Sequence, residues 1–129
     1  MFSPRFAARA AAAALMAASA LASAAAPARA AELIMFEEHG CMWCARWNEE
    51  VGDAYHLTAE GRRAPLVRRD IHDGPPEGVT LSIRPGFTPT FVLVENGLEV
   101  GRIEGYPGED FFWPMLNALL ARLPAGADG

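Results

Sequence analysis

The stretch HGCMWCARW, residues 39–47, decides how the rest of the chain is interpreted. It holds the chain's two cysteines, Cys41 and Cys44, and it follows the short apolar run LIMF at residues 33–36. A Cys-x-x-Cys placed where a buried strand turns into a helix is typical of a dithiol that exchanges disulfides. We expect the rest of the chain to position this pair, to tune its reactivity and to direct it to its compartment and partner.

Residues 1–30 are predicted to be a cleaved secretory signal peptide. Arg5 and Arg9 make its start positive, residues 10–26 form an alanine-rich apolar run, and Ala28-Arg29-Ala30 fits the small-x-small cleavage pattern. A membrane anchor is the alternative, but a run of this length made mostly of alanine is short and weakly hydrophobic for a span. The leader predicts a protein secreted into the periplasm.

The chain after residue 30 is strongly acidic. Three of the 11 basic residues and none of the 16 acidic residues fall in residues 1–30, which leaves a net charge of −8 with histidine neutral. This sign argues against nucleic acid or an anionic membrane as a partner. We expect one small monomeric domain over residues 31–124 and a disordered tail over residues 125–129.

The apolar patterning predicts four strands and two main helices. The expected strands cover residues 31–38, 64–71, 90–95 and 98–104; the helices cover 41–60 and 109–123, with one helical turn at 79–83. In the first helix, apolar residues recur every four positions as one stripe: Trp43, Trp47, Val51 and Tyr55. Gly61 is the expected stop of that helix, and Pro114 is expected near the first turn of the last one, or at a kink.

The connections between these elements predict the sheet. A right-handed crossover makes the first two strands parallel. Asn96-Gly97 tolerates the positive φ of a tight hairpin, which makes the last two strands antiparallel. The predicted fold class is α/β, a mixed four-stranded sheet flanked by helices.

This order of elements resembles the thioredoxin fold. The resemblance rests on Cys-x-x-Cys at the first strand–helix junction and on Thr88-Pro89 immediately before the third strand, and it covers essentially the whole chain after residue 30. It implies that Pro89 is in the cis form and lies against the dithiol. It also implies that Thr88 contacts the active site and the backbone of bound substrate.

Two longer stretches are similar to the small periplasmic thioredoxins of bacterial sulfur-oxidation (Sox) systems. They are CMWCARW at residues 41–47 and the ending GYPG…FWP within residues 105–114. This resemblance implies a reductase that keeps a Sox sulfur-carrier complex active and receives electrons from a membrane thiol transporter. The usual Trp-Cys-Gly-Pro-Cys is absent, and Met35 occupies the position where thioredoxins commonly have a buried aspartate. Glu37 and Glu38 follow it; either one substitutes for that acid from the strand end, or both are solvated charges, which we expect.

The chemistry of the pair assigns different roles to the two sulfurs. Cys41 at a helix N-terminus would have its thiolate stabilised by free N–H groups, whereas Cys44, one turn later, would be more buried. We therefore predict that Cys41 is the nucleophile, Cys44 the resolving thiol, and Cys41–Cys44 the redox-active disulfide. His39 either stabilises the thiolate or simply faces solvent in the turn.

The sequence allows more than one role for the side chains near the cysteines and more than one function for the pair. Trp43 is expected to shield the sulfurs or contact the partner, and Met42 is expected to be exposed, with or without partner contact. A purely structural disulfide would constrain so short a loop very little. A dithiol oxidase fits the same residues. A Cu(I) metallochaperone using both thiolates and Met42 is the metal alternative, because the spacing to His56 and His72 does not match zinc sites. We expect no cofactor and no metal.

Overall fold

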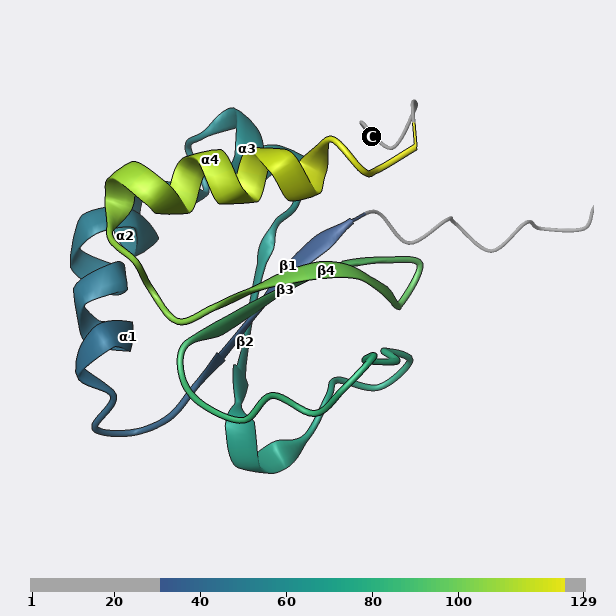
Figure 1. The fold of residues 1–129 in the computed structure, drawn as a ribbon, viewed down its shortest axis with the longest axis horizontal. Helices are drawn as coiled ribbons and strands as arrows, with labels where there is room; N and C mark the ends of the chain where they lie inside the picture. The colour runs from purple at the N-terminus through teal and green to yellow at the C-terminus, as the bar shows by residue number, and fades with distance from the viewer. Residues whose placement is uncertain (1–30, 125–129) are drawn as a thin grey trace, which may run out of the picture.

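The computed structural model describes residues 31–124 as a four-stranded mixed sheet with the strand order β2-β1-β3-β4 (Figure 1). The strands are β1 Glu32–Glu37, β2 Leu66–Asp70, β3 Thr90–Glu95 and β4 Leu98–Glu104. β1 runs parallel to β2 and antiparallel to β3, and β3 pairs antiparallel with β4. The predicted sheet is confirmed. The predicted signal peptide 1–30 and tail 125–129 lie outside the described residues.

The first predicted helix is a composite of short pieces. It contains α1 Met42–Trp47, the π-helical turn η1 Asn48–Gly52 and α2 Asp53–Tyr55, and it is followed by a separate α3 Ala59–Arg63. Gly61, the predicted stop, instead lies inside α3. There its amide donates to the capping Oγ1 of Thr58 at 2.9 Å. A Cβ at Gly61 would come within 1.9 Å of the Tyr55 carbonyl oxygen, so the glycine is required by close packing rather than by a helix end.

The single helical turn expected at 79–83 does not form. Thr80 instead makes an isolated parallel bridge with Leu98 at the edge of β4. Its amide donates to the Gly97 carbonyl at 2.7 Å, and its carbonyl accepts from the Glu99 amide at 3.3 Å. The edge strand offers unpaired backbone groups, and pairing with them replaces a local helical turn. A 3₁₀ turn, η2 Ile71–Asp73, follows β2 instead.

The last helix, α4 Glu109–Leu120, is shorter than predicted but contributes a well-packed face. Its buried residues, Phe112, Leu116, Leu119 and Leu120, follow a period near 3.6, and Leu123 is also buried beyond the helix end. Trp113, predicted on that face, is only half-buried because Phe112 occupies the core position. Pro114 lies in the second turn rather than the first.

The two faces of the sheet are covered differently. Leu33, Met35, Phe91 and Leu93 join one core cluster with residues of α1, η1, α2 and α4. The alternate residues form a second cluster, Ile34, Phe36, Val92 and Val94, covered by half-buried side chains of β2, η2 and the irregular segment 74–88. Figure 1 shows the labelled helices on one side of the sheet and this segment on the other. We call these the helix face and the loop face.

One indole fills the centre of the helix face. Trp47 is fully buried, and its ring lies 5.1 Å from that of Phe91 and 5.8 Å from that of Phe112. These aromatic contacts join α1, β3 and α4, so the helix that carries Cys44 is fixed between the sheet and the last helix. Among the described residues, no helix is long and apolar enough to cross a membrane.

Candidate active site

The two cysteines lie where β1 passes into α1 and are joined as a disulfide with a Cα–Cα distance of 5.2 Å. Gly40 makes the turn with φ +80°, and Cys41 is the N-cap of α1. The Sγ of Cys41 accepts a hydrogen bond from the Cys44 amide at 3.1 Å. Cys41 is half-buried, whereas Cys44 is 4% exposed. An incoming thiol therefore has better access to Cys41 than to Cys44.

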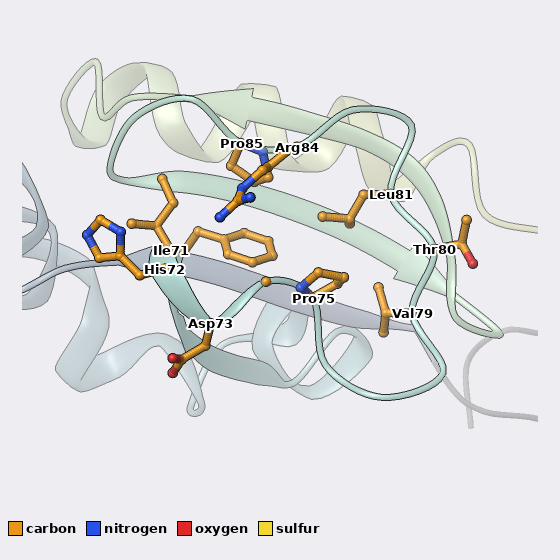
Figure 2. A pocket seen from close by; sticks show the side chains of 11 residues that line it. Ile71, His72, Asp73, Pro75, Val79, Thr80, Leu81, Arg84 and Pro85 are labelled. Atoms are coloured by element: carbon orange, nitrogen blue, oxygen red, sulfur yellow. The ribbon is translucent and has the colours of Figure 1, made fainter.

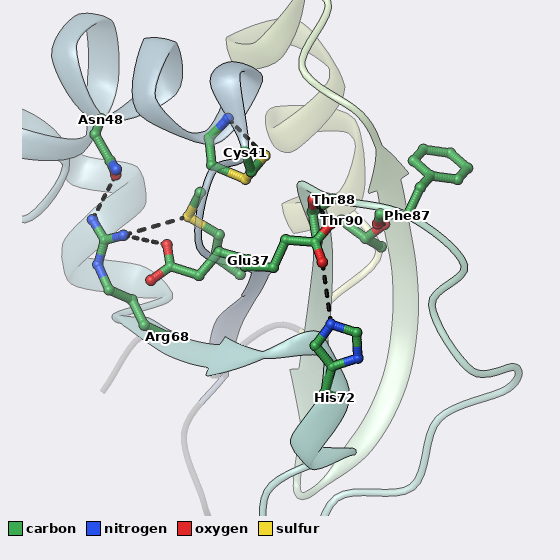
Figure 3. The surroundings of a disulfide bond; sticks show 11 residues. Glu37, Cys41, Asn48, Arg68, His72, Phe87, Thr88 and Thr90 are labelled. Atoms are coloured by element: carbon green, nitrogen blue, oxygen red, sulfur yellow. Dashed lines mark hydrogen bonds and ion pairs between the residues drawn. A yellow bond between two sulfur atoms is a disulfide. The ribbon is translucent and has the colours of Figure 1, made fainter.

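The peptide bond Thr88–Pro89 is cis, and Pro89 is buried at the start of β3. Figure 3 draws Thr88 among the residues around the disulfide. The Thr88 hydroxyl donates to Oε1 of Glu38 at 3.0 Å, and Oε2 of Glu38 lies 3.2 Å from Nε2 of His72. Glu38 is exposed, as the sequence predicted, and it is also hydrogen-bonded. It joins the end of β1 to the segment before β3 and to η2.

Met35 is fully buried behind the motif, so this position carries a thioether where thioredoxins commonly have a carboxylate. The side chain beside it is Arg68, whose Nη1 lies 3.7 Å from the Met35 sulfur and donates to Glu37 at 2.6 Å. Its Nη2 donates to Oδ1 of Asn48 at 2.8 Å (Figure 3). Glu37 is therefore ion-paired rather than merely solvated. The parallel register that places Met35 opposite Arg68 brings this group together.

Trp43 lies outside the buried stripe that the four-residue spacing predicted, with 47% of its surface exposed. The Arg46 guanidinium lies over its ring at 5.5 Å and pairs with Oε1 of Glu50 at 2.7 Å. The Tyr106 hydroxyl donates to the other oxygen of Glu50. Hydrogen bonds from Tyr106 and Arg46 hold the pKa of Glu50 below its usual value, while burial and the Glu50 charge raise the pKa of Tyr106. Trp43 is thus exposed, and its ring contacts an Arg46 guanidinium that Glu50 and Tyr106 hold in place.

A cleft of about 390 Å³ opens beside the sulfurs. It is lined by Glu37, Glu38, His39, Gly40, Cys41, Cys44, Ala45, Asn48 and Asp70. The structure thus brings His39 to the cysteine pair. Met42 is 75% exposed, and neither it nor Trp43 lines the cleft.

Metal-ligating side chains are dispersed over the described part of the chain. Within residues 31–124, no three His, Cys, Asp or Glu side chains are grouped so that they could hold a metal ion. His56 and His72 are both exposed, and His72 contacts Glu38.

The sheet order, the cis-proline and the Cys41–Cys44 disulfide at a strand–helix junction define a thiol–disulfide oxidoreductase with the thioredoxin fold. No family model and no curated protein matches the chain. Among solved structures it is similar to the periplasmic thioredoxin SoxS from Paracoccus pantotrophus, crystallised in its reduced form. The two are 52% identical over 71% of this chain and 97% of that chain, with a TM-score of 0.70. The chain belongs to the SoxS family of thioredoxins.

No sequence pattern predicted two of the hydrogen-bonded pairs at this site. Glu38 and Thr88 are 50 residues apart, and Tyr106 and Glu50 are 56 apart. Neither pair matches a local spacing rule, because the contacts depend on how β3 and α4 pack beside β1 and α1. Arg68 gave no clear signal either, since it is one of three charged residues that follow Leu66 and Val67 in the strand next to β1.

Proposed function

We propose that the protein is a periplasmic thioredoxin that reduces disulfides or mixed disulfides on partner proteins, a Sox sulfur-carrier protein being the substrate. The observation that carries the proposal is the unequal exposure of the two sulfurs, with Cys41 reachable at the N-cap of α1 and Cys44 buried behind it. The similarity to a periplasmic SoxS supports both the compartment and the Sox partner.

In the reduced protein, the Cys41 thiolate attacks one sulfur of the partner disulfide. A mixed disulfide forms, and the other partner sulfur leaves as a thiolate that takes up a proton. The Cys44 thiolate then attacks Sγ of Cys41 and releases the second partner thiol. Two electrons have moved to the partner, and the protein is left with the Cys41–Cys44 disulfide seen here.

The residues around the pair have positioning parts in this scheme. Free N–H groups at the start of α1 favour the Cys41 thiolate, and His39 in the cleft adds positive charge when it is protonated. Thr88 and Pro89 hold the backbone of the partner against Cys41, and Trp43 and Met42 contact the partner around the motif. A membrane thiol transporter returns two electrons, because the periplasm is kept oxidising.

Covalent trapping tests the assignment of roles. A Cys44→Ser variant expressed in the periplasm is expected to retain its partner as a mixed disulfide on Cys41, which mass spectrometry then identifies. A Cys41→Ser variant is the matched control and is expected to trap nothing. Equal trapping by both variants would contradict the roles given to the two cysteines.

A redox titration tests the direction of transfer. A reductase requires a potential well below that of a dedicated oxidase, about −120 mV for DsbA. A value near that figure would assign the dithiol oxidase function instead. Native mass spectrometry of anaerobically purified protein is the parallel test for the Cu(I) metallochaperone, which requires a stoichiometric copper.

A further inference from the structure

The loop face of the sheet holds a cavity of about 540 Å³ that the proposed chemistry does not use. Phe36 of β1 forms part of its apolar lining, together with Ile71, Pro75, Val79 and Leu81. Figure 2 shows the Arg84 side chain directed over this apolar surface, with the Asp73 carboxylate turned away from it. Its volume and its mainly apolar lining with few polar groups are typical of a ligand-binding cavity.

The wall of the cavity is anchored at several points. At the β4 edge, the Ser82 amide donates to Oε2 of Glu99 at 2.6 Å, and Arg102 donates to the Ile83 carbonyl at 2.6 Å. At the other end, Arg69 donates to the Gly74 carbonyl at 2.8 Å. These bonds tie both ends of the irregular segment to strands at the two edges of the sheet, so the wall of the cavity has a defined position in the fold.

The Arg84 guanidinium at this cavity has no partner among the described residues. Arg84 makes no hydrogen bond or ion pair within residues 31–124, whereas Arg68, Arg69 and Arg102 are each bonded to protein groups. A cation directed over an apolar surface favours a ligand that has both an apolar body and an anionic group.

The cavity adjoins another hollow that lies toward the active-site end of the molecule. A second hollow of about 210 Å³ shares part of its lining with the cavity: Ile71, His72, Arg84 and Pro85. It extends to Phe87 and to Glu38, whose carboxylate accepts the hydrogen bond from Thr88. A chain that lies against Thr88 therefore has a path past Phe87 into the cavity.

We propose that the cavity on the loop face is a second binding site for the substrate polypeptide, which places an apolar side chain against the half-buried Val79 and Leu81 and a neighbouring carboxylate against Arg84 while its cysteine reacts at Cys41. This site rests on the proposed function and deepens it, since it gives partner selection a location apart from the sulfurs. An acidic group on the partner suits Arg84 and would otherwise be repelled by the net negative charge of this chain.

The test uses peptides that carry one cysteine as a mixed disulfide with thionitrobenzoate. Each peptide carries a Leu-Asp or a Leu-Asn extension, placed either before or after the cysteine. Glycine spacers of about two to eight residues, which span roughly 7 to 28 Å when extended, join the extension to the cysteine. A short peptide without an extension is the control. The reduced protein releases thionitrobenzoate in a single turnover and becomes oxidised to its disulfide, and the rate of release gives the second-order rate constant for each peptide.

At one spacer length, we expect Leu-Asp to exceed Leu-Asn by about fivefold, the range of a solvent-accessible ion pair. Arg84→Ala should abolish that preference and leave the short peptide within about twofold of the parent. Arg122→Ala, which removes an exposed arginine just beyond α4, is the matched control and should keep the preference. Arg84→Glu should prefer a Leu-Arg extension.

An acid preference below about twofold at every spacer length would overturn the site, as would an equal loss of preference in Arg122→Ala. Binding of dodecanoate in the cavity without any acid preference among the peptides would assign it to a small amphiphile and overturn it too. If even the short peptide is not reduced, the proposed function itself fails, and the substrate site fails with it.

Discussion

The helix face and the loop face are built from alternate residues of the same strands, yet they pack differently. On the helix face, Trp47 and Phe112 interlock with Phe91 and leave the core closed. On the loop face, an irregular segment held at a few hydrogen bonds covers Phe36 and leaves a cavity of about 540 Å³. A helix presents a continuous apolar stripe to a sheet, whereas an irregular segment must turn backbone groups toward its own partners. The closely packed helix face therefore holds the sulfurs in place, whereas the loop face leaves space for a ligand.

The largest expected effect separates chemistry from recognition. Cys41→Ser should lower the second-order rate constant for the short mixed-disulfide peptide by at least about a thousandfold, because the nucleophile is lost. Arg84→Ala should leave that value nearly unchanged, because the short peptide does not reach the loop face. The release of thionitrobenzoate measures both, and a large loss in Arg84→Ala would mean that the loop face acts on the chemistry itself.

Neighbouring core residues test the packing of the two faces. Leu33 and Ile34 are both fully buried in β1 and belong to the helix face and the loop face respectively. Leu33→Ala should cost about 4 kcal/mol of unfolding free energy and Ile34→Ala about 2 kcal/mol, because the cost falls where the surroundings can collapse. Urea denaturation measures both. Equal losses would show that the loop face is packed as tightly as the helix face.

Two buried hydroxyls give a smaller contrast. On the helix face, Tyr55 donates to the carbonyl of fully buried Ala64 at 2.7 Å. On the loop face, Thr90 donates at 2.7 Å to the carbonyl of exposed Phe87. Tyr55→Phe should cost about 1.5 kcal/mol and Thr90→Val about 0.5 kcal/mol, since only the second carbonyl can turn to water. Chemical denaturation checks this order, and its reversal would contradict the assignment of the faces.

The smallest expected effects depend on pH. Hydrogen bonds from Tyr106 and Arg46 lower the pKa of Glu50. Burial raises the pKa of Glu99, but hydrogen bonds from Arg102 and Ser82 outweigh the effect of burial, so the pKa of Glu99 is lowered as well. A lowered folded-state pKa adds stability above the unfolded value near 4.5 that is lost as pH falls through the folded value.

Glu50→Gln and Glu99→Gln should therefore each lose less stability than the parent between neutral pH and about pH 3. Amide exchange at neutral pH locates the two effects. Glu99→Gln should speed exchange of the Ser82 amide on the loop face, because a neutral acceptor binds it more weakly. Glu50→Gln should leave that amide unchanged. If both variants altered it, the two faces would be coupled.

Much of the fold and the centre of the site could be predicted from local patterns. The run LIMF predicts the buried strand β1, Asn96-Gly97 predicts the hairpin, and the cysteine spacing predicts the redox motif. Local patterns failed where packing decides the outcome. The four-residue spacing put Trp43 on the same apolar stripe as the buried Trp47, although Trp43 is exposed. The glycine at 61 suggested a helix end, although close contact with Tyr55 explains it better.

The sequence by itself determined the pairing of the first two strands and of the last two, the position of the cysteine pair and the family resemblance, because these depend on side-chain periodicity, connection lengths and short spacings. Only the tertiary structure decided which charges meet at the site. Glu38 reaches Thr88, Arg68 reaches Glu37 and Arg84 is left without a partner, and each outcome depends on how segments far apart in the sequence pack together. It also decided that the helices gather on one face, because a residue pattern shows that a strand is buried but not what covers it.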